Sequence, residues 1–97
     1  MSAFLLTRHR LGPAWDPTLP VEDQSGWPEH ARVMDEMVAR GVIVIGGPVG
    51  AGERVVLVCE AATAAELLDG LSADPWTGTH LVDEVESLTI RLDARHR

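Results

Sequence analysis

The histidines and aspartates of this 97-residue sequence best suit acid/base chemistry on a small molecule, and its tryptophans suit the wall of a pocket. His30 stands near the start of an apolar periodic stretch, four residues before Met34 and seven before Met37. At about 100° per residue, this spacing places the imidazole on the apolar face of a helix, directed inward. An unpaired buried ring would cost ~1–3 kcal/mol. The partner of His30 is therefore the main functional question in the sequence.

The elements that must position His30 follow the order β-α-β-β-α-β. The sequence predicts strands at 3–9, 42–45, 54–59 and about 81–92, helices at 27–41 and from 63 for about 8–10 residues, a long loop at 10–27 and a glycine-rich turn at 46–52. This order is typical of a ferredoxin-like α+β domain, with two helices on one face of a four-stranded antiparallel sheet. We expect a single domain over 1–97, with a frayed tail at 93–97.

Local signals support both helices. Pro28 suits the first turn, where its missing N–H costs nothing, and Gly41 suits the left-handed stop position. Thr63 and Glu66 form a capping-box pattern at the start of the second helix. We therefore expect His30 to lie in the first turn of a well-defined helix.

This topology gathers several polar and aromatic residues at one end of the sheet. They are His9, His30, the glycine turn 46–52, Asp74, Trp76 and His80. The loop 10–27, which carries Trp15 and ends at Trp27, also arrives there. The two indoles can pack the loop against the core, which is the interpretation we favour, or they can contact a ligand.

Three strands are apolar on both faces, which a monomeric sheet with one wet face does not explain. They are the runs Phe4-Leu5-Leu6, 42–45 and 55–58. The simplest cover for the second face is the same sheet of a second copy. We therefore expect a homodimer that forms an α+β barrel.

Composition excludes several classes of partner. A net charge of −7 opposes binding to nucleic acid phosphates. No apolar run approaches the roughly 20 residues needed to cross a membrane. The sequence has one cysteine, Cys59, which lies in an apolar strand and suits an inert core position. We expect a cytoplasmic protein.

Four short motifs in register resemble the YciI-like (YCII-related) family. They are Pro28-Glu29-His30 opening a helix, Gly46-Gly47-Pro48 after a strand, Glu60-Ala61-Ala62 before the second helix, and Ala73-Asp74-Pro75-Trp76 after it. The resemblance implies a ferredoxin-like fold, a dimeric α+β barrel similar to muconolactone isomerase, and an active site built on a histidine and an aspartate. Those two residues map to His30 and Asp74. The loop 10–27 is longer than in the family and carries its own tryptophan.

The leading hypothesis is a His30–Asp74 pair for general acid/base catalysis. A carboxylate on one imidazole nitrogen fixes the tautomer and leaves the other nitrogen to act on a substrate. This chemistry suits a cofactor-independent isomerase or lyase acting beside a carbonyl. The residues expected to contact the small-molecule ligand are Trp15, Trp27, Trp76, His9, His80, Gly47 and Pro48.

Three alternatives stay open. Asp74-Pro75 is also typical of a turn, in which Asp74 binds nearby N–H groups and His30 simply ties the helix to that turn. A dimeric module can use the same pocket to bind a small ligand without turnover. His9, His30, His80 and Asp74 are also suitable metal ligands by type, although no pair has a tight ligand spacing, and we expect no metal.

Overall fold

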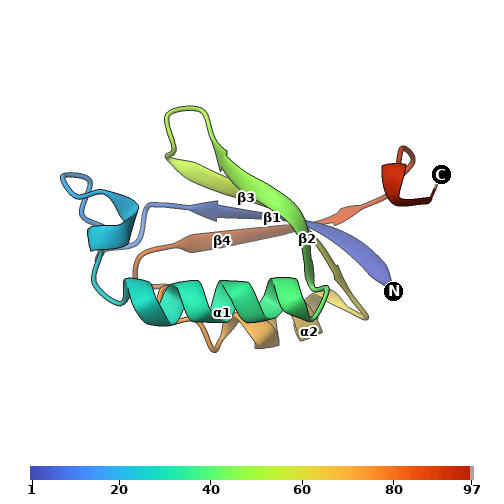
Figure 1. The fold of residues 1–97 in the computed structure, drawn as a ribbon, viewed down its shortest axis with the longest axis horizontal. Helices are drawn as coiled ribbons and strands as arrows, with labels where there is room; N and C mark the ends of the chain where they lie inside the picture. Colours follow the sequence, from blue (N-terminus) through green and yellow to red (C-terminus); the bar gives the residue numbers. More distant parts are fainter. Residues whose placement is uncertain (97) are drawn as a thin grey trace.

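The computed structural model describes residues 1–96 and has the predicted β-α-β-β-α-β order. The elements are β1 (Ser2–His9), a 3-10 helix (Val21–Asp23), α1 (Trp27–Ala39), β2 (Ile43–Val49), β3 (Arg54–Ala61), α2 (Ala64–Leu71), β4 (Val82–Leu88) and a second 3-10 helix (Ala94–His96). The four strands form one antiparallel sheet in the order β2-β3-β1-β4. Both helices lie along the same face of this sheet (Figure 1). The ferredoxin-like prediction is confirmed.

The sheet has an inner face toward the helices and an outer face away from them. On β1, the inner residues Phe4 and Leu6 are buried in the core. They pack with Val33 and Met37 of α1, which are the buried residues of that helix. The central position of β1 between β3 and β4 fixes which of its side chains meet the helices.

The ends of the two helices follow the predicted signals. Gly41 has a φ of 76°, and the N–H of Val42 bonds the carbonyl oxygen of Met37 at 2.9 Å, as in a left-handed C-terminal cap. At α2, the Thr63 hydroxyl accepts the Glu66 backbone N–H at 3.1 Å. These caps define the end of α1, which carries His30 in its first turns, and the start of α2.

The glycine-rich segment after Ile45 differs from the prediction. It was expected to form the hairpin turn, but β2 continues through Val49, and Gly47 and Pro48 pair with Val56 and Val55 of β3. Pro48 is tolerated because β2 is an edge strand, so the missing N–H breaks no inner ladder. The turn itself lies between Val49 and Arg54.

The last strand is shorter than predicted. Residues 81–92 were expected to form it, but β4 ends at Leu88, and Leu92 is 97% exposed. Alternation alone did not place the end of the strand, because that end depends on pairing with the neighbouring strand β1, where the last pair is Ala3 with Leu88, close to the start of β1. In the segment predicted to fray, Arg95 bonds Glu60 at 2.7 Å, while Arg97 lies outside the described residues.

Candidate active site

Asp74 is the centre of a buried hydrogen-bond network. It follows α2 in a tight turn, and its Oδ1 accepts the backbone N–H of Trp76 at 2.9 Å. Its Oδ2 accepts His30 Nδ1 at 2.9 Å and Arg8 Nη1 at 2.7 Å. The carboxylate is 2% exposed. One side chain therefore joins β1, α1 and the segment between α2 and β4.

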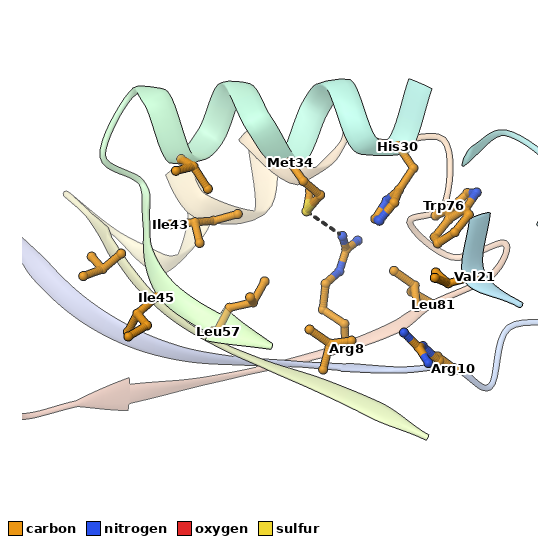
Figure 2. A pocket seen from close by; sticks show the side chains of 14 residues that line it. Arg8, Arg10, Val21, His30, Met34, Ile43, Ile45, Leu57, Trp76 and Leu81 are labelled. Atoms are coloured by element: carbon orange, nitrogen blue, oxygen red, sulfur yellow. Dashed lines mark hydrogen bonds between the residues drawn. The ribbon is translucent and has the colours of Figure 1, made fainter. Parts of the chain in front are cut away.

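Arg8 is the second residue on which several hydrogen bonds of this network converge, and the sequence analysis did not identify it as a site residue. Its side chain is 1% exposed and lies on the inner face of β1. Besides Asp74, it donates to both carboxylate oxygens of Asp83 at 2.7 and 3.2 Å and to the Thr77 hydroxyl at 2.9 Å. A fifth N–H faces the Met34 sulfur at 3.6 Å (Figure 2). The two-residue alternation Phe4, Leu6, Arg8 is the signal that could have identified an inward arginine.

These contacts determine the charge of the network. Burial alone would raise the pKa of Asp74, but the hydrogen bonds from His30, Trp76 and Arg8 and the Arg8 charge hold that pKa below its usual range. Burial also opposes the charge on Arg8, but Asp83 and Asp74 outweigh it and raise the pKa of the guanidinium. Asp74 is therefore an anion at neutral pH, and Arg8 is a cation.

The anionic state of Asp74 fixes the proton on His30. Because Asp74 Oδ2 can only accept, Nδ1 of His30 must carry the hydrogen in their 2.9 Å bond. In the neutral ring, Nε2 is then the basic nitrogen. Among residues 1–96, no hydrogen bond to this nitrogen is present. The ring also stacks on Trp76, with centroids 3.9 Å apart and planes at 10°, which holds its orientation.

Trp76 lies between two imidazoles. His80 stacks on it with centroids 4.9 Å apart, and burial lowers the pKa of His80 more than the charge of Asp74 raises it. His80 is held by hydroxyl groups: Ser25 Oγ lies 3.0 Å from Nε2 and Thr79 Oγ1 lies 2.9 Å from Nδ1. His80 thus stacks on the Trp76 ring, and its lowered pKa favours the neutral imidazole.

A cavity of about 370 Å³ lies between α1 and the inner face of the sheet, beside His30 (Figure 2). Its wall is mostly aliphatic, and its polar side chains are His30, Arg8 and Arg10. The other lining residues are Val21, Met34, Val38, Ile43, Val44, Ile45, Gly46, Val55, Leu57, Trp76 and Leu81. The volume lies in the range of small-molecule sites, roughly 300–1,000 Å³. A base facing an apolar, partly enclosed space suits acid/base chemistry on a small organic molecule.

Hydrogen bonds attach the long loop 10–27 to residues 76–80, next to this cavity. Gly12 and Ala14 donate backbone N–H groups to the carbonyls of His80 and Thr79, at 3.0 and 2.8 Å. The Trp76 indole donates to the Ser25 carbonyl at 2.7 Å. Inside the loop, the buried Gln24 amide bonds the Asp16 backbone in both directions, and sequence reasoning did not identify it.

The predicted ligand-contacting tryptophans lie at different distances from the cavity. Trp76 lines it. Trp15 packs edge-on against Trp76 at 5.7 Å, and Trp27 packs against both Trp76 and His30, at 5.8 and 5.7 Å. Trp15 and Trp27 thus pack against Trp76 and do not line the cavity.

The remaining predicted residues do not meet the cavity. Gly47 and Pro48 lie on β2 beyond its lining residue Gly46. His9 alternates with Arg8 and so lies on the outer face, where its Nε2 is 3.1 Å from Glu84. His9 and His30 therefore lie on opposite faces of the sheet, which contradicts a metal site that uses both. Residues 1–96 hold no group of three His, Cys, Asp or Glu side chains arranged to bind a metal ion.

No protein-family model matches the sequence, and a search of the curated proteins finds no match. Within the described part of the chain, none of the helices has the length and apolar character to cross a membrane.

Proposed function

We propose that this protein is a small-molecule enzyme of the YCII-related type that uses His30 as a general base and acid. One observation carries the proposal: Asp74 fixes the His30 proton on Nδ1, which leaves a basic Nε2 beside an apolar cavity. Such an arrangement needs no cofactor to remove a proton from a carbon atom next to a carbonyl. The resemblance of Pro28-Glu29-His30 and Ala73-Asp74-Pro75-Trp76 to that family supports the same pair of residues.

The proposed reaction starts with a proton transfer from the substrate carbon to His30 Nε2. The electron pair of the broken C–H bond moves toward the carbonyl and gives an enolate. Asp74 stabilises the imidazolium that forms, because its carboxylate already accepts the Nδ1 hydrogen. Return of the proton to a different carbon completes an isomerisation, and loss of a leaving group completes an elimination. Both outcomes fit an isomerase or lyase.

The outer face of the sheet supports a homodimer as the working form. Leu5, Val56 and Val58 lie on this face with no helix over them (Figure 1). A second copy packed through this face would remove these side chains from water. We expect light scattering at micromolar concentration to give the mass of a dimer, and a monomer would refute this part of the proposal.

Solvent-exchange kinetics test the catalytic role of His30. Small cyclic carbonyl compounds and lactones are incubated with the protein in deuterated water, and NMR follows the exchange of the carbon-bound hydrogens. Replacing the general base should slow exchange by about 10²–10⁴-fold in His30→Gln. Arg40→Gln is the control, because Arg40 is exposed at the end of α1 and lies neither in the cavity lining nor on the outer face of the sheet. Equal exchange by the parent and His30→Gln would contradict the proposal.

A non-catalytic ligand-binding module is the second candidate. It is favoured by the pairing of the buried atoms of the network, since no buried side-chain N or O atom among the described residues lacks a hydrogen-bond partner. Such pairing suits a scaffold that joins Arg8, His30 and Asp74 for stability. In that case a bound molecule would be recovered unchanged from both the parent and His30→Gln.

A further inference from the structure

Arg10 is the charged residue of the cavity that the proposed chemistry does not use. Its Nη1 donates to the Gly52 carbonyl at 2.6 Å, and its guanidinium lies over the Trp15 ring, 4.8 Å from the centroid. The two contacts hold the group in place at the cavity wall. Neither contact neutralises its charge, because a carbonyl oxygen and an indole carry no net charge.

The charges around Arg8 and Arg10 differ. Arg8 is paired with the carboxylates of Asp74 and Asp83. Among residues 1–96, no carboxylate lies within ion-pair distance of Arg10, although the chain carries 15 acidic residues. A guanidinium has five N–H donors, and the bond to Gly52 uses one of them. The cavity therefore presents an uncompensated cation with free donors beside an aliphatic wall (Figure 2).

From this arrangement we infer that the cavity binds a small apolar molecule with a carboxylate, and that Arg10 binds the carboxylate. A planar guanidinium matches a carboxylate through two parallel hydrogen bonds. The inference rests on the proposed function in that this molecule is the substrate of His30. It adds a substrate class, a carbonyl compound that carries a carboxylate, and a residue that sets specificity.

The positions of the two arginines support this orientation. Arg8 lies on β1 and Arg10 directly follows the end of that strand, and both side chains line the cavity. A carboxylate held by Arg10 leaves the body of a small molecule against Arg8 and His30. The Arg8 N–H that faces the Met34 sulfur at 3.6 Å has only a weak acceptor, so a ligand carbonyl oxygen can replace it. The acidic C–H would then lie between the two arginine-bound ends, near His30.

A binding experiment that needs no turnover tests the inference. Phenylacetate and its neutral isostere phenylacetamide are titrated at equal ionic strength, and NMR follows the indole N–H signals of the three tryptophans. We expect phenylacetate to bind the parent at least 10-fold more tightly than phenylacetamide, with shifts at Trp15 and Trp76. Arg10→Gln should lose this preference. Arg40→Gln is the matched control, since it removes the same charge from an exposed position at the end of α1.

Three results would overturn the inference: equal affinity of the parent for both probes, no binding of phenylacetate at millimolar concentration, or an unchanged preference in Arg10→Gln. His30→Gln separates this inference from the proposed function. It should keep the preference for the carboxylate while losing solvent exchange. If binding discriminates but exchange does not depend on His30, the catalytic proposal fails and the carboxylate site stands.

Discussion

Replacing Asp74 by asparagine should destabilise the fold strongly, although the two side chains have nearly the same shape. The carboxylate accepts three hydrogen bonds through two oxygens, from Trp76 on one and from His30 and Arg8 on the other. An asparagine has a single acceptor oxygen. Its NH₂ group must therefore face either the Trp76 N–H or the Arg8 N–H, so a buried donor always loses its partner.

The size of the effect follows from these losses. An unpaired buried donor costs ~1–3 kcal/mol. Breaking a buried ion pair costs ~3–5 kcal/mol, but Arg8 keeps its two bonds to Asp83, which favours the lower limit. We therefore expect Asp74→Asn to lower the free energy of unfolding by about 3 kcal/mol. Domains of this size have total stabilities of only about 5–15 kcal/mol.

Urea unfolding at one fixed protein concentration measures this change. Asp69→Asn is the matched control, because Asp69 is exposed on α2, and it should change stability by less than about 0.5 kcal/mol. His30→Ala should cost less than Asp74→Asn, since Asp74 would keep Arg8 and the Trp76 N–H. A loss below about 1 kcal/mol in Asp74→Asn would refute the view that this carboxylate joins the elements.

Three further predictions concern stability and reactivity. Because the pKa of Asp74 is lower in the folded protein than its unfolded value of about 3.9, the ionised Asp74 stabilises the fold at pH values above 3.9. This stability is lost as the pH falls through the folded pKa. In urea unfolding, Asp74→Asn should therefore show a weaker loss of stability with acid than the parent. Burial raises the pKa of Cys59 to about 11 despite the nearby arginine charge, so at pH 8 the thiol should react with a disulfide reagent only after unfolding. A methyl group on Gly46 would collide with the Val56 carbonyl, so Gly46→Ala should lower the free energy of unfolding by ~1–3 kcal/mol. A methyl group on Gly47 would meet no atom within 4 Å, so Gly47→Ala should change it by less than ~1 kcal/mol. Thermal unfolding of both variants measures the difference.

The fold could be predicted from the sequence because its signals are local. The periodic stretch from His30 to Met37, the glycine at position 41 and the Thr63 cap each act within a few residues. The end of β4 could not be predicted, because it depends on the register with β1, whose last pair with β4 is Ala3 with Leu88.

The site could be predicted only in part. His30 was identified by its place on an apolar helix face, but its bond to Asp74 joins residues 44 positions apart and needs the complete fold. Arg8 was missed because the charged run 8–10 suggests the end of a strand, although its alternation with Leu6 placed it on the inner face. The sequence could not show that Arg10 lacks a carboxylate partner among the described residues, because this depends on where the acidic residues lie in the fold.

The measurement that tests the central claim most directly is the protonation pattern of the His30 ring. Nitrogen-15 NMR of the imidazole groups distinguishes a protonated ring nitrogen from one with a free electron pair, and His30→Gln assigns the signals. In the neutral ring, we expect the hydrogen on Nδ1 and a free electron pair on Nε2, because the Asp74 carboxylate accepts from Nδ1. A neutral His30 with its hydrogen on Nε2 would contradict the account, because the ring would then have no base to offer the cavity.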